Sequence, residues 1–217
     1  MIHTHRLPSL QGSRPGRLMR RLRILTVEDE APVAESLNAA LVALGHQVVG
    51  TAKDGAEAVV SASKYHPDLI IMDIRMPGTD GIEAAKEILA QRAAPIVLLS
   101  AYGDEELARR AGEAGVMAYL LKPVDLRQLQ STVEVAFARF EKLVALDQEV
   151  TTLKEALETR KLVEKAKGIV MERLNLPEAK AFHLLQERSR SQRVSLKALA
   201  SKILEAEDVL KLIGGDS

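Results

Sequence analysis

Five short apolar runs alternate with five amphipathic segments between residues 22 and 140, and this alternation restricts the possible folds more than any other feature. The apolar runs are Leu22–Val27, Gln47–Val49, Leu69–Met72, Ile96–Leu99 and Met117–Leu121. The amphipathic segments, which are typical of helices, are Ala31–Leu44, Gly55–Lys64, Gly81–Gln91, Glu105–Ala114 and Leu126–Phe140. Strands that are apolar on both faces and alternate with helices indicate a parallel sheet covered on both sides. We therefore expect a doubly wound, five-stranded α/β domain, a fold that binds ligands at the carboxyl ends of its strands.

Strand patterns stop after Phe140, and the remainder has the pattern of helices alone. Leucine and valine recur there at alternating steps of three and four residues, which is typical of a heptad seam. The members of this seam are Leu143, Leu146, Val150, Leu153 and Leu157. The seam can pair with a second chain or pack on the α/β domain. Further helices are predicted to end at Leu174, to span 177–189, and to begin behind Ser195, a favourable N-cap residue.

Charge is distributed unevenly although the formal net charge is zero. Residues 28–125 carry 16 acidic and 8 basic side chains, whereas residues 160–202 carry 4 acidic and 11 basic ones. An acidic front and a locally basic back indicate two functions in one chain. The predicted parts are a flexible basic tail over 1–21, the α/β domain over 22–140, a helical linker with the heptad seam over 141–155, and a small all-α three-helix domain over 156–217.

Composition excludes several classes of protein. The chain contains no cysteine, so it has no disulfide framework and no thiolate metal site. No apolar run approaches the roughly 20 residues of a membrane helix, and the N-terminus lacks the apolar core of a signal peptide. We expect a soluble cytoplasmic protein with no membrane contact.

Acidic side chains stand where the predicted strands end. Glu28 and Asp29 follow the first strand, and Asp73 follows the third, its neighbour at the switch point of such a sheet. Carboxylates gathered in one cleft repel each other and require a cation, and oxygen ligands suit Mg²⁺. An aspartate beside Mg²⁺ is a competent phosphoryl acceptor. Lys122 can then pair with the acyl phosphate, and Ser100 can donate a hydrogen bond to it.

Four motifs at these strand ends resemble the signature of response-regulator receiver domains, over roughly residues 22–140. They are LTVEDE at Leu25–Glu30, MDIRMPGTDG at Met72–Gly81, Ser100-Ala101 and Leu121-Lys122-Pro123. The resemblance implies a flavodoxin-like receiver fold in which a partner histidine kinase phosphorylates Asp73. It also implies a Mg²⁺ site, whose ligands are Glu28, Asp29, Asp73 and the backbone carbonyl of Arg75.

The same resemblance implies how a signal leaves the pocket. Ser100 and Tyr119 match the switch pair of the family, and Lys122 matches the residue that contacts the phosphate. The chain departs from the frequent pattern only by Glu-Asp in place of Asp-Asp and by Ser100 in place of threonine, and both variants are tolerated. We expect no metabolic enzyme, only slow self-dephosphorylation, because aspartate-nucleophile hydrolases usually carry an acid where this chain has Arg75.

Residues 151–204 resemble the ANTAR domain, a three-helix RNA-binding module of transcription antitermination regulators. The matching residues are Leu157, Arg160, Val163, Lys165 to Arg173, Glu178, Ala179, Phe182, Leu184, Leu185, Leu199 and Ala200. The resemblance implies that the active protein is a homodimer that binds RNA hairpins, as paired stem-loops, and prevents a terminator from forming. The match is loose over Gln186–Val194. We expect Phe182 in the core of this domain.

The predicted RNA-binding residues lie on the first helix of this module. They are Arg160, Lys161, Lys165, Lys167, Gly168 and Arg173. Their charges can neutralise phosphates, and Gly168 leaves room for a close approach of the RNA backbone. One alternative is a helix with solvated basic residues and a dimer contact at Gly168. Another is an output domain that binds DNA or docks on a protein, although no glycine-containing tight turn indicates a helix-turn-helix.

Overall fold

The computed structural model describes residues 20–78, 80–91, 94–101, 103 and 105–214. The predicted tail over 1–21 lies outside this range except for its last two residues. The chain divides between Lys142 and Leu143 into two compact units, and each is described by itself. Among the helices of the described ranges, none is long and apolar enough to span a membrane.

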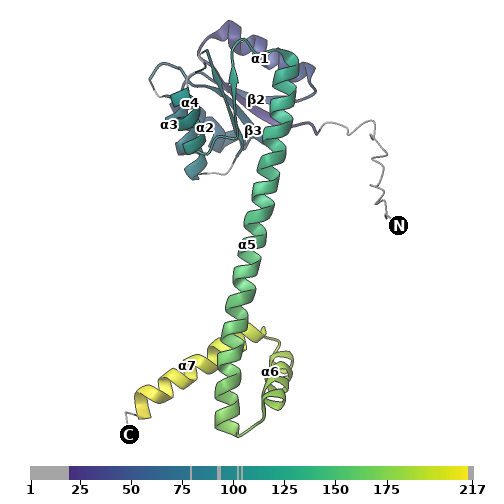
Figure 1. Ribbon diagram of the computed structural model, residues 1–217, viewed down its shortest axis with the longest axis vertical. Helices are drawn as coiled ribbons and strands as arrows, with labels where there is room; N and C mark the ends of the chain where they lie inside the picture. The colour runs from purple at the N-terminus through teal and green to yellow at the C-terminus, as the bar shows by residue number, and fades with distance from the viewer. Residues whose placement is uncertain (1–19, 79, 92–93, 102, 104, 215–217) are drawn as a thin grey trace, which may run out of the picture. The chain divides into compact units, whose positions relative to one another are not determined.

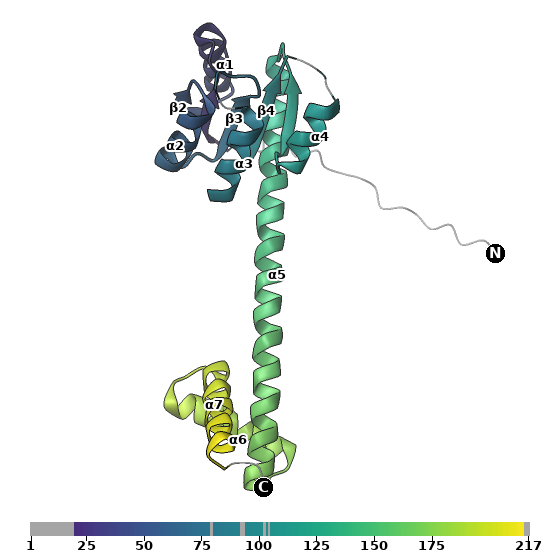
Figure 2. The same cartoon turned by 90° about the vertical axis from the view of Figure 1, so that its left-hand side faces the viewer.

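The first unit is built on a parallel sheet of five strands in the order β2-β1-β3-β4-β5. The strands are β1 (Arg23–Val27), β2 (Gln47–Ala52), β3 (Leu69–Asp73), β4 (Ile96–Ser100) and β5 (Ala118–Leu121). The helices that cover it (Figures 1 and 2) are α1 (Ala31–Ala43), α2 (Gly55–Tyr65), α3 (Gly81–Gln91), α4 (Glu105–Glu113) and the beginning of α5 (Leu126–Leu174). This arrangement confirms the predicted doubly wound α/β fold.

Alternate side chains of the strands supply two hydrophobic cores, one on each face of the sheet. Ile70 and Met72 of β3 pack with α2, α3 and α4, whereas Ile71 packs on the opposite face with α1 and α5. All residues of β3 and β4 are buried, because these central strands are covered on both faces. Each fully buried aliphatic side chain contributes about 1.5–3 kcal/mol to folding. The two cores therefore fix the positions of the strand ends.

The strand ends differ slightly from the predicted ones, and the difference concerns the polar residues. Asp73 and Ser100 are the last residues of β3 and β4, where the sequence pattern predicted that they follow these strands. Apolar alternation cannot identify a polar residue that still makes ladder contacts, and Asp73 pairs with Leu99 of β4. Lys122 directly follows β5, and its peptide bond to Pro123 is cis. Three polar side chains thus meet at one edge.

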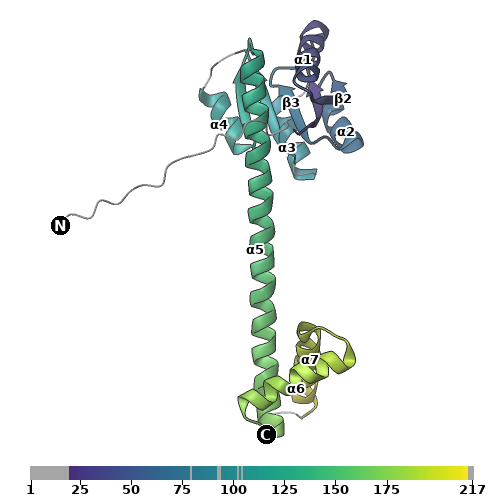
Figure 3. The same ribbon diagram turned by 90° about the vertical axis from the view of Figure 1, so that its right-hand side faces the viewer.

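The second unit consists of helices only, which confirms the predicted all-α C-terminal part. Here α5 runs unbroken to Leu174 and is followed by α6 (Glu178–Gln192) and α7 (Leu196–Gly214), as Figure 3 shows. Ser195 caps α7, since its Oγ accepts a hydrogen bond from the N–H of Ala198 at 3.1 Å. A small core formed by Val163, Ala166 and Ala200 holds α5 and α7 together.

His46, just before β2, is a buried titratable side chain of the first unit, with 4% of its surface exposed. Its Nδ1 accepts a hydrogen bond from the N–H of Leu22 at 3.3 Å, and its Nε2 has no hydrogen-bond partner in the described part of the chain. Burial lowers the pKa of His46, and the charge of Glu134 on α5 opposes this only in part. The folded chain therefore keeps this imidazole neutral.

We predict that His46 makes the stability of the protein depend on pH. The unfolded chain binds a proton near the ordinary histidine pKa of 6.5, whereas the folded chain resists it. This contribution is therefore complete above pH 6.5 and is lost as the pH falls through the lowered pKa of the folded state. His46→Asn keeps an acceptor for Leu22 but does not titrate, so it should flatten the profile by up to about 1.4 kcal/mol per pH unit. Urea unfolding at about pH 7.5, 6.5 and 5.5 gives the slope of the unfolding free energy against pH for the wild type and for His46→Asn. Equal slopes in the two proteins would contradict the prediction.

Candidate functional site

Three carboxylates and one ammonium group meet at the carboxyl edge of the sheet. Glu28 and Asp29 follow β1, Asp73 ends the neighbouring β3, and one oxygen of each lies within 4.8 Å of the others. The Nζ atom of Lys122 lies 2.6 Å from Glu28 Oε2 and 2.5 Å from Asp73 Oδ2. The structure thus brings together four of the residues that the sequence analysis assigned to this site. We call Glu28, Asp29, Asp73 and Lys122 the acidic cluster.

Burial and ion pairing act in opposite directions on the charges of the acidic cluster. Glu28 is 1% exposed, and burial raises the pKa of its carboxyl group although the hydrogen bond from Lys122 works against this. Burial disfavours the charged form of Lys122, but its hydrogen bonds to Asp73 and Glu28 outweigh that effect and raise its pKa. One ammonium group therefore faces three carboxyl groups, an excess of negative charge that a divalent cation can offset.

The loop between β3 and α3 is held close to Asp73. The N–H of Arg75 donates a hydrogen bond to Asp73 Oδ1 at 3.1 Å, which places the backbone of Arg75 beside the acidic cluster. A Cβ atom at Gly81 would lie 2.2 Å from the carbonyl oxygen of Asp73, so only glycine allows α3 to begin so near the strand end. Asp80 caps this helix by accepting a hydrogen bond from the N–H of Ile82 at 2.9 Å.

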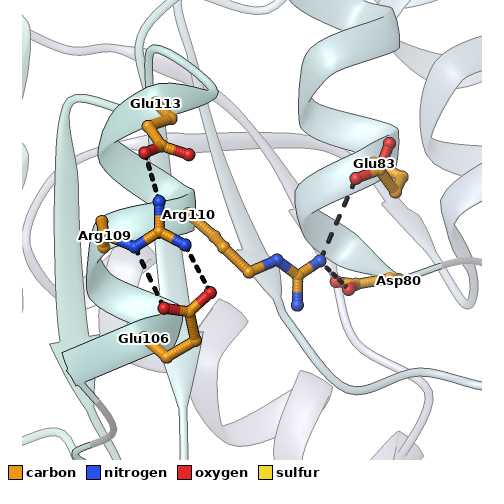
Figure 4. A network of polar contacts seen from close by, with 6 residues as sticks. All are labelled: Asp80, Glu83, Glu106, Arg109, Arg110 and Glu113. Atoms are coloured by element: carbon orange, nitrogen blue, oxygen red, sulfur yellow. Dashed lines mark hydrogen bonds and ion pairs between the residues drawn. The ribbon is translucent and has the colours of Figure 1, made fainter.

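Arg110 of α4 links that helix to the start of α3. Its Nη2 atom lies 2.7 Å from Oδ2 of Asp80, the residue that caps α3 (Figure 4). Arg109, by contrast, is paired within α4, with Glu106 and Glu113. Asp80 therefore makes two contacts at once. Its Oδ1 accepts the hydrogen bond that caps α3, and its Oδ2 pairs with Arg110. This ion pair therefore joins α4 to the start of α3.

A groove of about 620 Å³ opens beside the acidic cluster, between the β3–α3 loop and α4. Asp29 and Arg75 line one part of it, and Asp80, Leu107 and Arg110 line another. Two cationic side chains, Arg75 and Arg110, and two carboxylates, Asp29 and Asp80, therefore surround one opening next to the acidic cluster.

The predicted switch residues lie on the two strands next to this groove. Ser100 ends β4 and is 1% exposed. Tyr119 lies on β5, the strand paired with β4, and its partly buried ring packs against the core that also contains Leu107 and Ala111 of α4. Tyr119 therefore packs on the same core as the side chains of α4.

The six predicted RNA-binding residues all lie on α5, but they do not share one environment. Arg160 and Lys165 are exposed and form no ion pair within the described residues, and Lys161 pairs with Glu158 at 3.1 Å. Gly168 is exposed in the last two turns of α5, and a Cβ atom there would have no neighbour within 4 Å. Glycine in a helix interior costs about 1 kcal/mol relative to alanine, so the fold itself supplies no reason for glycine at this position.

Two of the six residues hold the helices of the second unit together. Lys167 is 8% exposed, and its Nζ lies 2.5 Å from Glu164 Oε2 and 2.7 Å from Oε1 of Glu178 at the start of α6. Arg173 forms two hydrogen bonds, of 3.0 and 3.2 Å, with Glu207 of α7. The basic character of a residue in the sequence could not distinguish these structural ion pairs from side chains that remain available. The prediction that Phe182 is a core residue is wrong, because it is 37% exposed.

Comparisons with known proteins assign both units. The model of the response regulator receiver domain matches residues 24–134, and the model of the ANTAR domain matches residues 151–204. The chain is 45% identical to the transcriptional regulatory protein PdtaR of Mycobacterium tuberculosis over 183 residues, which is 84% of this chain and 89% of that protein. It is 36% identical to the regulatory protein AtoC of Escherichia coli over 138 residues, which is 63% of this chain and 29% of AtoC.

Solved structures agree with the fold of the first unit. The receiver domain of a modulated diguanylate cyclase from Desulfovibrio desulfuricans is 33% identical, with a TM-score of 0.53, and covers 56% of this chain and 97% of its own. The CheX–CheY–BeF3–Mg complex from Borrelia burgdorferi matches with 28% identity and a TM-score of 0.52, over 53% of this chain and 88% of that chain. The chain therefore belongs to the two-component response regulators, with a receiver domain followed by an ANTAR domain.

Proposed function

We propose that this response regulator is a phosphorylation-controlled antiterminator of the cytoplasm. A partner histidine kinase phosphorylates Asp73, and the phosphorylated receiver increases the binding of RNA hairpins by the ANTAR domain. The observation that carries the proposal is the acidic cluster, in which Asp73 lies between Lys122 and two further carboxylates, in the same chain as an RNA-binding type of domain. An output domain that binds duplex DNA or a protein is the alternative outcome of the tests below.

The acidic cluster fits a Mg²⁺ ion, because it offers three carboxylates in mutual reach of one cation and the backbone of Arg75 lies beside them. When bound there, Mg²⁺ supplies positive charge that offsets the charge of the transferring phosphoryl oxygens. A carboxylate oxygen of Asp73 attacks phosphorus and forms a P–O bond, while the P–N bond of the kinase's phosphohistidine breaks. Lys122 then pairs with the phosphoryl oxygens, to which Ser100 donates a hydrogen bond.

The chemistry ends with this acyl phosphate, which is a signal and not an intermediate of metabolism. Arg75 stands two residues after Asp73, where an acid would be needed to activate water as in phosphatase-type hydrolases. Water therefore removes the phosphoryl group only slowly. We propose no other enzymatic activity for the chain.

The signal leaves the pocket through β4, β5 and α4. Ser100 moves toward the phosphoryl oxygens, and Tyr119 turns into the space that this movement frees. The core shared by Tyr119, Leu107 and Ala111 then repacks, and the ion pair between Arg110 and Asp80 resists or follows the shift of α4. Phosphorylation can act only through the difference in stability between two such states. A partial shift of the population is sufficient for control.

We predict that Lys122→Met lowers the free energy of unfolding in metal-free buffer by about 1–3 kcal/mol, because Glu28 and Asp73 then lack their ammonium partner. Mg²⁺ should restore more stability to this variant than it adds to the wild type, since the ion no longer competes with an ammonium group. Urea unfolding with and without Mg²⁺ measures both effects. The matched control is Lys53→Met, which changes an exposed lysine outside the cluster. A Mg²⁺ response equal to that of the wild type would contradict the assignment of the site.

We predict that a phosphoryl mimic tightens RNA binding. The purified full chain is titrated into labelled paired RNA hairpins and into duplex DNA at fixed salt, with and without beryllofluoride and Mg²⁺. Tighter binding of the hairpins with the mimic, on the order of 5- to 150-fold as for other coupled sites, supports phosphorylation control. Asp73→Asn removes the acceptor and should abolish the gain. Binding of duplex DNA alone, or of neither nucleic acid, would rule out the proposed antitermination function.

The heptad seam on α5 is exposed and has the composition of a helix–helix contact. Leu143, Leu146, Val150, Leu153 and Leu157 are each 46–62% exposed. Side chains spaced by three and four residues pair with the same seam of a second helix. We propose that a second copy of the chain covers the seam in the active protein. A homodimer then presents two ANTAR domains, which matches two stem-loops in one RNA.

We predict that Leu146→Glu combined with Leu153→Glu prevents this dimer, because the charges would be buried in an apolar interface. Sedimentation velocity of the beryllofluoride form should shift from dimer to monomer. A control with two exposed valines outside the seam, Val42→Glu and Val60→Glu, should remain dimeric. If the beryllofluoride form of the wild type is monomeric across micromolar concentrations, the seam is not a dimer interface.

A further inference from the structure

Basic side chains gather where α6 ends and α7 begins, away from the residues of α5 that the sequence analysis assigned to RNA. Arg188 and Arg190 lie in the last turns of α6, Arg193 is its C-cap residue, and Lys197 is the second residue of α7. All four side chains are exposed, and residues 188–204 contain no acidic residue. We call Arg188, Arg190, Arg193 and Lys197 the corner cluster; its turn is visible in Figure 1 between α6 and α7.

The corner cluster combines four exposed cations that lack counter-charges, a property that single residues such as Arg160 and Lys165 of α5 share. Arg109 of α4 and Lys167 and Arg173 of α5 are each held by glutamates. None of the four side chains of the corner cluster forms an ion pair or a hydrogen bond within residues 20–78, 80–91, 94–101, 103 and 105–214. Like charges that no acid balances repel each other and create a positive local potential, which attracts an anionic partner. Arg190 lies in the last turn of α6, where a cation is favourable to the helix dipole, but none of the four charges is neutralised by an acid of the described residues.

Arg193 occupies the C-cap position of α6, where glycine is the usual residue. Its φ of 54° and ψ of 37° are left-handed, and its N–H donates to the carbonyl oxygens of Arg190 and Ser189 at the end of α6. Glycine, or less often asparagine, is the usual residue at this C-terminal position, because a side chain with a Cβ is strained there. Arg193 therefore lowers the stability of the fold through backbone strain, and no ion pair with a described acid compensates for that strain. This independent observation also indicates a function outside the fold.

We propose that the corner cluster contacts RNA phosphates and forms a second part of the RNA interface, in addition to the available residues Arg160, Lys165 and Gly168 of α5. The inference rests on the proposed function. Guanidinium groups bind phosphate oxygens through paired N–H donors, and the neighbouring exposed side chain of Gln192 is a further donor that suits a sugar–phosphate backbone. The ANTAR resemblance is loosest over Gln186–Val194, which contains the three arginines. The contact therefore belongs to this chain and adjusts its affinity for its own hairpins.

The first test removes three charges from the corner cluster in the full chain. Arg188→Gln, Arg190→Gln and Arg193→Gln are combined, and binding of a labelled RNA hairpin is measured over a range of salt concentrations with beryllofluoride and Mg²⁺ present. Each lost phosphate contact should lower the slope of log K against log salt by about 0.7–0.9. We expect a total decrease of about 2 and an affinity lower by on the order of tenfold.

The matched control removes the same number of charges from the first unit, at the exposed residues Lys53, Lys64 and Arg127. The control should keep the slope of the wild type within about 0.5. An unchanged slope in the arginine variant, or an equal decrease in both variants, would overturn the corner cluster as a contact site. So would an equal loss of duplex DNA binding, which indicates unselective attraction. If the wild-type chain binds no hairpin at all, the proposed function fails instead.

The second test separates binding from stability at Arg193. Arg193→Gly relieves the left-handed backbone strain, so the melting temperature of the full chain should stay the same or rise. The slope of the salt dependence should nevertheless fall by about 0.7–0.9, as for one lost contact. A variant that melts no lower than the wild type and binds RNA with an unchanged slope would show that Arg193 makes no contact. Reduced binding without reduced stability supports the proposal.

Discussion

The ion pairs of Lys122 with Glu28 and Asp73 are the interaction on which the first unit depends. They join the end of β5 to the ends of β1 and β3 across the carboxyl edge of the sheet. Without a cation, the three carboxyl groups that the parallel sheet gathers at this edge would repel each other. The same ammonium group that relieves this repulsion is placed to meet a phosphoryl group on Asp73. The stability of the fold and its chemistry therefore use one contact.

The surroundings of the acidic cluster connect the end of β3 with the contacts of α3 and α4. Gly81 lets α3 begin against the carbonyl oxygen of Asp73, and Asp80 both caps α3 and holds Arg110 of α4. Tyr119 packs in the same core as the side chains of α4. Charge added at Asp73 is therefore close to two contacts that set the position of α4. A pocket with isolated acids would lack such a connection.

The basic residues of the second unit fall into two groups, those that pair with a glutamate and those that do not. Lys167 and Arg173 are neutralised by glutamates and hold α6 and α7 on α5. Arg160 and Lys165 of α5 and the corner cluster remain without counter-charges in the described ranges. The buried apolar core of this domain is formed by few residues, and these ion pairs add contacts between its helices. Its remaining positive charge is available to a polyanion.

The sequence by itself determined the α/β class, the order of strands and helices, and the set Glu28, Asp29, Asp73 and Lys122. It could do so because two-sided apolar runs with polar residues at their ends allow few arrangements. Only the tertiary structure decided that Asp80 pairs with Arg110, that Lys167 and Arg173 are structural, and that Phe182 is exposed. These properties depend on which side chains of separate helices meet. Such contacts arise from packing and leave no period in the sequence.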